Sequence, residues 1–248
     1  MYIPDRPLLL LFLLCWALSC VDPPYPRELV LQHVPTAIAV AALTAGRQRM
    51  RLGRTSEQLV LAFLALHVLG ARYLYSYVPY DDWAAALVGR PISSMFGWTR
   101  NHYDRLVHLA YGLLLYFPLR EAIERRSDLR GASSGALAVQ GILASSAFYE
   151  IAEWWVALTF ASEWAEHYNG QQGDPWDAQK DMALAAAGAL ASAVVCGVWR
   201  GSHVRRRLAK AAHRLLESAV GSIHCKLQNE NCKLPFEACT IGSACRVK

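Results

Sequence analysis

Six apolar segments alternate with short polar connections along the first 200 residues. The segments are Leu8–Val21, Val30–Ala45, Glu57–Tyr75, Tyr103–Leu119, Ala136–Phe160 and Lys180–Trp199. A helix that crosses a hydrocarbon core of about 30 Å needs about 20 residues at 1.5 Å per residue, and the longer segments approach or exceed this length. The pattern therefore predicts an all-α protein, in which residues 1–200 form a polytopic membrane bundle of about six transmembrane helices.

The composition agrees with this prediction. Of the 248 residues, 54% are hydrophobic and 18% are charged, whereas soluble domains carry about 25% charged residues. The formal net charge is +5, but most arginines lie between the apolar segments and do not form one face of a soluble domain. We therefore expect the lipid bilayer as partner and no nucleic acid, and we attribute the positive charge to membrane topology.

Basic residues gather in every second connection. They follow segments two, four and six: Arg47, Arg49, Arg51 and Arg54; Arg120, Arg125, Arg126 and Arg130; Arg200, Arg205, Arg206, Arg207 and Lys210. Lys and Arg are retained on the cytoplasmic side of a membrane when they lie in short loops. The pattern predicts that both termini are cytoplasmic and that the connections 21–29, 76–102 and 161–179 lie on the outer side.

The first apolar segment has two interpretations. It is either a signal anchor, which we favour, or part of a cleaved signal peptide. The second interpretation is based on Arg6, the leucine run and the small residues near Cys20. Both interpretations leave the segment after Cys20 outside, so the predicted topology of the later segments does not change.

Two further regions follow the bundle. Residues 201–220 are predicted to form a basic amphipathic helix on the anionic inner leaflet, because apolar side chains recur there at helical spacing. Residues 221–248 show no periodicity and are predicted to be a poorly ordered tail. Its four cysteines lack the paired C-x-x-C spacing of common zinc sites, and we expect them to be free thiols: Cys225, Cys232, Cys239 and Cys245.

Ionisable residues begin the fourth apolar segment. Asp104 and His108 are four residues apart, and this spacing places them on one face of a helix. The carboxylate can orient the imidazole or share a cation with it. The alternative is an interfacial hydrogen-bonded pair, in which the helix N-terminus favours Asp104.

The fifth segment contains Glu150 and Glu153 within an apolar stretch. An acidic residue at the bilayer centre costs about 2.5–3.5 kcal/mol on insertion scales, so such a residue indicates a functional site by default. The alternative is a glutamic acid that is kept neutral, or one that pairs with a neighbouring polar residue for packing.

The approach to the sixth segment is rich in aspartate. Asp174 before Pro175 predicts a helix N-cap with proline at the first helical position, and Asp177 then lies in the first turn. Asp181 is one turn further along, where capping does not explain it. In the third segment, the isolated His67 is interpreted as an interior residue in preference to a ligand.

Under the predicted topology, these residues converge in the outer half of the bundle. The predicted catalytic residues are His108, Glu150, Glu153 and Asp181. The hypothetical metal ligands are His108, Glu150, Glu153, Asp177 and Asp181. The predicted binding residues are His67, Tyr73, Tyr103, Asp104, Gln172, Gly173, Asp174, Asp177 and Gln179. Carboxylates with one imidazole suit a divalent cation such as Mg²⁺, Mn²⁺ or Zn²⁺.

These motifs resemble the YjdF-type family of bacterial inner-membrane proteins over roughly residues 57–199. The resemblance is based on the run His67–Tyr75, the block Asn101–His108, the pairs at 149–150 and 153–154, and the motif Gly173–Met182. It implies a multi-pass protein of the bacterial inner membrane and does not itself imply an activity. A weaker similarity to VanZ-like membrane proteins involves Asp104, His108, Glu150, Asp181 and Gly188.

Three hypotheses for function follow from these residues. The first is a metal-dependent enzyme or envelope-modifying factor that acts on lipid head groups or lipid-linked small molecules. The second is a proton- or cation-coupled transporter, in which Glu150 and Glu153 bind the coupling ion. The third is a non-catalytic binding or assembly protein. The sequence leaves the substrate, the enzymatic character and the oligomeric state open.

Overall fold

The computed structural model describes residues 6–45, 52–159 and 171–199, together with Arg214 and Glu217. All regular elements in this part of the chain are helices, which confirms the all-α prediction. The helices are α1 (Arg6–Ser19), α2 (Pro26–Ala45), α4 (Arg54–Arg72), α5 (Tyr80–Val88), α6 (Ile92–Phe96), α7 (Tyr103–Arg126), α8 (Gly131–Thr159) and a last helix, Asp177–Trp199.

The chain divides into two compact units, residues 1–194 and 195–248. The predicted amphipathic helix 201–220 and the predicted tail 221–248 belong to the second unit. Apart from Arg214 and Glu217, both lie outside the described residues.

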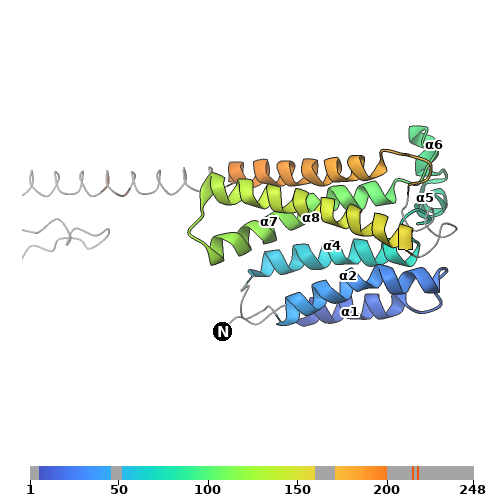
Figure 1. The fold of residues 1–248 in the computed structure, drawn as a ribbon, viewed down its shortest axis with the longest axis horizontal. Coiled ribbons are helices and arrows are strands. Elements are labelled where there is room, and N and C mark those ends of the chain that lie inside the picture. The colour runs from blue at the N-terminus through green and yellow to red at the C-terminus, as the bar shows by residue number, and fades with distance from the viewer. Residues whose placement is uncertain (1–5, 46–51, 160–170, 200–213, 215–216, 218–248) are drawn as a thin grey trace, which may run out of the picture. The chain divides into compact units, whose positions relative to one another are not determined.

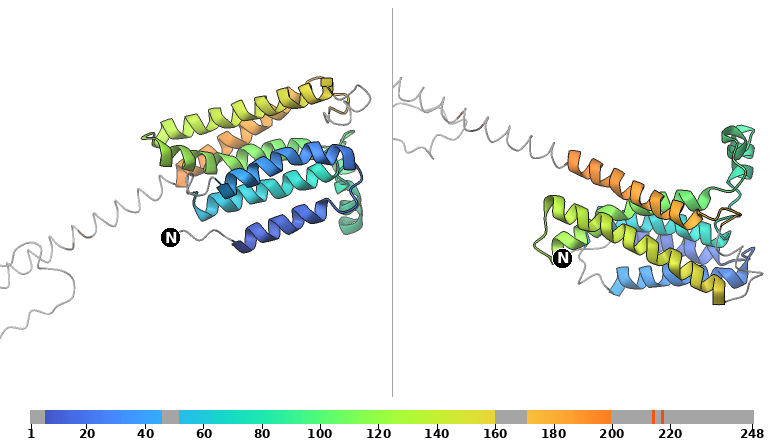
Figure 2. Two further views of the ribbon diagram at one scale, coloured as in Figure 1. Left: turned by 60° about the horizontal axis from the view of Figure 1, so that its bottom comes forward. Right: turned by 45° about the horizontal axis from the view of Figure 1, so that its top comes forward.

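Within the first unit, the long helices lie side by side and alternate in direction (Figures 1 and 2). The short helices α5 and α6 lie where α4 ends and α7 begins. We call this end of the bundle the α5 end. The connection from α1 to α2 and the start of the last helix lie at the same end (Figure 1). It is the end that the arginine pattern predicts to face outward.

Three of the described helices are long and apolar enough to cross a membrane: α7, α8 and the last helix. Helix α1 is apolar but has only 14 residues, which corresponds to about 21 Å. Helices α2 and α4 have 20 and 19 residues, but both include charged and polar side chains. The structure therefore supports a helical membrane protein, and the number of six spans stays a prediction.

Helices α4 and α7 form the centre of the bundle. Helix α4 packs against α1, α2 and α7, and α7 also packs against α8. Phe12 of α1 is buried with Leu61, Leu64 and Val68 of α4. At the α5 end, Arg72 of α4 donates hydrogen bonds to main-chain carbonyls at and just beyond the end of α1, including that of Ser19 at 2.6 Å. Arg72 thereby satisfies carbonyls that a helix end leaves without partners.

Helix α7 and the last helix touch through their backbones. A Cβ atom on Gly112 would overlap the carbonyl oxygen of Ala185 and would lie 2.7 Å from the amide nitrogen of Ala189. A Cβ atom on Gly188 would overlap the carbonyl oxygen of Leu109. Small residues at this crossing let the two helices approach more closely than larger side chains would allow.

Several helix ends differ from the predicted segment ends. Helix α4 ends at Arg72, three residues before the predicted Tyr75, because Leu74 and Tyr75 have positive φ angles of 51° and 56°. Helix α7 continues through Pro118 to Arg126. Its last turns are held by the buried Arg120, which binds Glu124 and the main-chain carbonyl of Gly131 at the start of α8.

The N-cap predicted at Asp174 is also displaced. The last helix begins at Asp177, so Asp174 lies three residues before the helix and does not cap it directly. The side chain of Asp174 accepts a hydrogen bond from the amide of Trp176 at 3.1 Å. Its other carboxylate oxygen accepts hydrogen bonds from Arg105 and Lys180. Ion pairing therefore determines where this side chain lies.

Helices α5 and α6 lie within a connection that the sequence analysis treats as a loop. Asp81 in the first turn of α5 accepts a hydrogen bond from the amide of Ser93 at 2.8 Å, which joins the two helices. Both end in a left-handed glycine, Gly89 and Gly97. Such residues are common helix terminators because glycine has no Cβ penalty there.

Replacing Gly112 with alanine should destabilise the bundle by roughly 1–3 kcal/mol, because the added methyl overpacks a backbone crossing. Gly197→Ala is the matched control, since a Cβ there meets open space, and alanine is the better helix former. The free energy of unfolding in mixed detergent micelles measures both effects. Equal stability of the two variants would contradict the proposed close contact.

Candidate cation and ligand site

Four ionisable side chains from three helices meet inside the first unit, toward the α5 end. Asp104 and His108 come from adjacent turns of α7, Glu150 from α8 and Asp181 from the last helix. The His108 Nε2 atom lies 3.6 Å from Asp104 Oδ1 and 3.4 Å from Glu150 Oε1. Ligand atoms of Asp104, His108 and Asp181 all lie within 4.8 Å of one another. We call these three residues the DHD group.

Two acidic oxygens in this region are buried without a hydrogen-bond partner among the described residues. They are Oδ1 of Asp181, a residue that is 2% exposed, and Oε1 of Glu150. Buried polar atoms without partners are rare in proteins because each costs free energy. The two oxygens therefore indicate that a proton, a water molecule or a ligand completes the site.

The side chains around His108 Nε2 lie too far apart for direct hydrogen bonds. The separations of 3.4 and 3.6 Å around His108 Nε2 exceed the usual hydrogen-bond range of about 2.7–3.2 Å. Atoms that bind one cation at about 2.1 Å lie roughly 3.0–3.4 Å apart in octahedral or tetrahedral geometry. Small shifts of the DHD group would be enough to close it around a cation.

The nearby basic side chains bind other aspartates. Arg100 lies 2.6 Å from Asp177, and Arg105 and Lys180 each lie 2.6 Å from Asp174. We call these five residues the outer ion-pair network. The aspartates of the outer ion-pair network bind these basic side chains. The DHD group and Glu150 therefore combine three carboxyl groups with a single imidazole.

The outer ion-pair network joins the start of α7 to the segment before the last helix. Next to it, the Asn101 amide donates to Oε1 of Gln172 at 2.9 Å, and Gln172 Nε2 donates back to the Asn101 carbonyl at 3.1 Å. The hydrogen bond from Lys180 is the largest cause that lowers the pKa of Asp174, to about 2, and the Trp176 amide and Arg105 contribute further.

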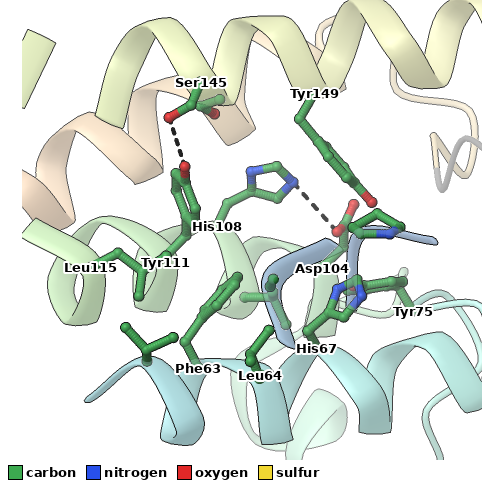
Figure 3. Close-up of a pocket in the computed structure, with 15 residues that line it drawn as sticks. Phe63, Leu64, His67, Tyr75, Asp104, His108, Tyr111, Leu115, Ser145 and Tyr149 are labelled. Atoms are coloured by element: carbon green, nitrogen blue, oxygen red, sulfur yellow. Dashed lines mark hydrogen bonds and ion pairs between the residues drawn. The ribbon is translucent and has the colours of Figure 1, made fainter. Parts of the chain in front are cut away.

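A cavity of about 240 Å³ lies beside the DHD group, between α2, α4, α7 and α8. Asp104 and His108 line it (Figure 3). The other lining residues are mainly apolar or aromatic: Pro35, Ala39, Val60, Phe63, Leu64, His67, Tyr75, Val107, Tyr111, Leu115, Ser145, Ser146 and Tyr149. The cavity is partly open to its surroundings, so water or part of a lipid can enter it. We therefore expect it to be filled.

One wall of the cavity depends on a turn after α4. Tyr75 folds back so that its hydroxyl contacts Nδ1 of His67, and His67 Nε2 lies 3.1 Å from the Gln32 carbonyl. A Cβ atom on Gly70 would lie 2.6 Å from the Tyr75 ring, so glycine at position 70 makes room for it. Both ring nitrogens of His67 have partners, as an interior histidine requires.

The structure thus brings together Asp104, His108, Glu150 and Asp181. It places the remaining predicted residues as follows. Glu153 accepts a hydrogen bond from Tyr149, the Tyr103 hydroxyl donates to the Leu66 carbonyl at 2.9 Å, and Tyr73 packs edge-on against Trp83. Asp177 and Asp174 belong to the outer ion-pair network, Gln172 binds Asn101, Gly173 has a φ of 82°, and Gln179 is exposed.

The predicted site residues do not include Ser146 and Tyr111 in the cavity, or Arg100 and Arg105 in the outer ion-pair network. Ser146 precedes Glu150 by four residues, so helical spacing alone puts both on one face of α8. Its Oγ atom is also buried without a partner among the described residues. The two arginines are less accessible to sequence reasoning, because their partners are about 70 residues away.

The comparisons with known proteins agree with this picture. Residues 5–202 match a family described as "Predicted membrane protein (DUF2238)". The chain belongs to this family. It is 33% identical over 178 residues to "Inner membrane protein YjdF" of Escherichia coli (strain K12), and the match covers 71% of this chain and 81% of that protein. No solved structure matches the chain.

The family match contains every residue of the DHD group and of the outer ion-pair network. It confirms the resemblance to YjdF-type proteins and the assignment to a membrane. The similarity to VanZ-like proteins stays a prediction.

Acid should weaken the outer ion-pair network between about pH 4 and pH 2. The pKa of Asp174 is lowered from 3.8 to about 2 in the folded protein, so its stabilising contribution is complete above pH 4 and is lost as the pH falls through 2. Thermal unfolding at pH 5, 4, 3 and 2 measures the loss. Asp174→Asn should reduce this acid dependence, whereas Asp82→Asn, at an exposed position of α5, should leave it unchanged.

Proposed function

We propose that this protein binds a divalent cation at the DHD group and uses it on phosphate-bearing lipid head groups or lipid-linked small molecules. The observation that carries the proposal is that ligand atoms of Asp104, His108 and Asp181 lie within 4.8 Å of one another, beside a buried Asp181 Oδ1 that has no hydrogen-bond partner among the described residues. The cation itself would supply Lewis-acid stabilisation of phosphate charge.

Each residue has a distinct role in this proposal. Asp104, His108 and Asp181 are the direct ligands, and Glu150, which lies 3.4 Å from His108, is a fourth candidate. Glu153 would act through Tyr149, with which it is hydrogen-bonded. One imidazole with several carboxylates suits Mn²⁺ or Zn²⁺, and Mg²⁺ is also compatible when water molecules complete its shell.

The charge of the site supports a bound cation over protonation of its carboxyl groups. Three carboxyl groups and one imidazole in the apolar part of the bundle would carry a net charge of about −2 if the carboxylates were ionised and the imidazole protonated or shared. Isolated buried charges are strongly unfavourable unless they are paired or coordinate a metal. A dication would offset this charge.

The proposed site faces the non-cytoplasmic side of a bacterial inner membrane, and all six long helices span it with both termini in the cytoplasm. This topology is supported by the basic connections between α2 and α4 and between α7 and α8. The name of the Escherichia coli relative supports the inner membrane. An outward site would give access to lipid head groups of the outer leaflet.

Metal analysis of the purified protein tests the cation proposal. We expect close to one equivalent of Mn²⁺ or Zn²⁺, or recoverable Mg²⁺, in the unmodified protein. Asp181→Asn should lower the affinity at least about tenfold, as for the loss of a ligand or its supporting group. Asp82→Asn is the matched control and should keep the metal. A stable Asp181→Asn variant with an unchanged metal content would contradict the proposal.

The alternative to the cation-dependent function is a transporter, which the position of two acidic residues near the cavity favours. Glu150 and Glu153 lie on α8 close to a cavity lined by four helices, an arrangement in which a proton or cation could move between acidic groups. In this case, Glu153→Gln should reduce proton or cation flux into liposomes, with Glu217→Gln as the control. Flux that does not change would remove Glu153 from a transport pathway. If the purified protein contains no metal and carries no flux, a binding or assembly protein is favoured.

A further inference from the structure

The cavity changes in polarity along the bundle. On α7 its lining runs from Asp104 and His108 near the α5 end, through Tyr111, to Leu115. The other helices add Ala39 and Val60 away from the α5 end. The distance along α7 from Asp104 to Leu115 is about 16 Å. One end of the cavity is therefore polar and the other apolar, as an amphiphile requires.

The polar atoms in the middle of the cavity differ in their hydrogen bonding. The Tyr111 hydroxyl and Ser145 Oγ lie 2.6 Å apart and satisfy each other (Figure 3). Ser146 is 2% exposed, lines the cavity, and its Oγ has no partner among the described residues. A hydroxyl in this state can donate to a ligand oxygen. Ser146 lies one turn, or about 6 Å, along α8 from Glu150.

The size of the cavity limits what can enter. An apolar cavity of about 150 Å³ accepts a molecule the size of benzene, and the cavity here has about 240 Å³. This volume suits part of one hydrocarbon chain and is too small for two chains with a head group. Any second chain of a lipid would have to stay in the bilayer.

We propose that the cavity binds one ester-linked acyl chain of a glycerophospholipid. The first methylene groups of the chain lie between the ester and Leu115, the ester carbonyl accepts a hydrogen bond from Ser146, and the phosphate faces the DHD group. The rest of the chain lies in the bilayer. This inference rests on the proposed function, because the carboxyl groups of the site would repel a phosphate unless a cation lies between them. It deepens the proposed function by naming the substrate class.

Photocrosslinking tests the position of the chain. The probe is phosphatidylglycerol with a diazirine in the first few methylene groups after the ester of one acyl chain, mixed into phosphatidylglycerol–phosphatidylethanolamine vesicles that contain the full-length, metal-loaded protein. We expect crosslinks on Ala39, Val60 and Leu115, which we call the deep crosslinks. Crosslinks confined to bilayer-exposed positions such as Leu113, which is 43% exposed, would overturn the inference.

Two matched variants make the test specific. Leu115→Trp fills the cavity and should reduce the deep crosslinks about tenfold, the equivalent of a modest loss of binding free energy. Leu113→Trp adds the same side chain two residues away on an exposed face and should leave them unchanged. If Leu115→Trp does not fold, Ser146→Ala replaces it, with an expected decrease of severalfold for the ester-linked probe and none for a prenyl phosphate carrying the same diazirine.

The same samples separate failure of this inference from failure of the proposed function. Leu115→Trp should keep its bound metal, and Asp181→Asn should lose both the metal and the deep crosslinks. Bound metal without deep crosslinks would overturn the acyl-chain inference and leave the cation site in place. Deep crosslinks that persist in metal-free Asp181→Asn would overturn the placement of the phosphate. If the prenyl phosphate probe crosslinks as strongly as the phosphatidylglycerol probe, or more strongly, the choice of an ester-linked lipid is overturned.

Discussion

The contact between the backbones of α7 and the last helix determines the rest of the site. Gly112 and Gly188 remove the side chains that would otherwise separate the two helices. His108 lies one turn from Gly112, and Asp181 lies about two turns from Gly188. A wider separation of the helices would move Asp181 away from His108 and Asp104. The positions of the acidic groups therefore follow from two residues that have no chemistry of their own.

Much of the fold could be predicted from the sequence because membrane insertion imposes strong patterns. Apolar length located the ends of the long helices to within seven residues, and helical spacing paired Asp104 with His108. The end of α4 could not be predicted, because it depends on the left-handed backbone of Leu74 and Tyr75, which has no glycine to signal it. The helices α5 and α6 were missed because they are short and flanked by prolines and glycines.

Four of the predicted site residues, Asp104, His108, Glu150 and Asp181, lie together in the structure, whereas the predicted ligand Asp177 binds Arg100. The cost of acidic residues in a membrane identified Glu150, and the limits of capping identified Asp181. Sequence alone could not show that Asp177 would bind Arg100 while Oδ1 of Asp181 has no hydrogen-bond partner among the described residues, because one turn of a helix separates the two aspartates. That division depends on which residues 70 or more positions away come to lie beside each aspartate.

The turn after α4 has a consequence for how this sequence can change. The Tyr75 ring occupies the volume where a Cβ atom on Gly70 would lie. A side chain at position 70 and a large ring at position 75 therefore cannot occur together. A relative with alanine at the position of Gly70 would need a smaller or differently directed residue in place of Tyr75, and would then lose the hydroxyl beside His67. Positions 70 and 75 should consequently vary together among related sequences. Such covariation would reveal this part of the cavity wall without a structure.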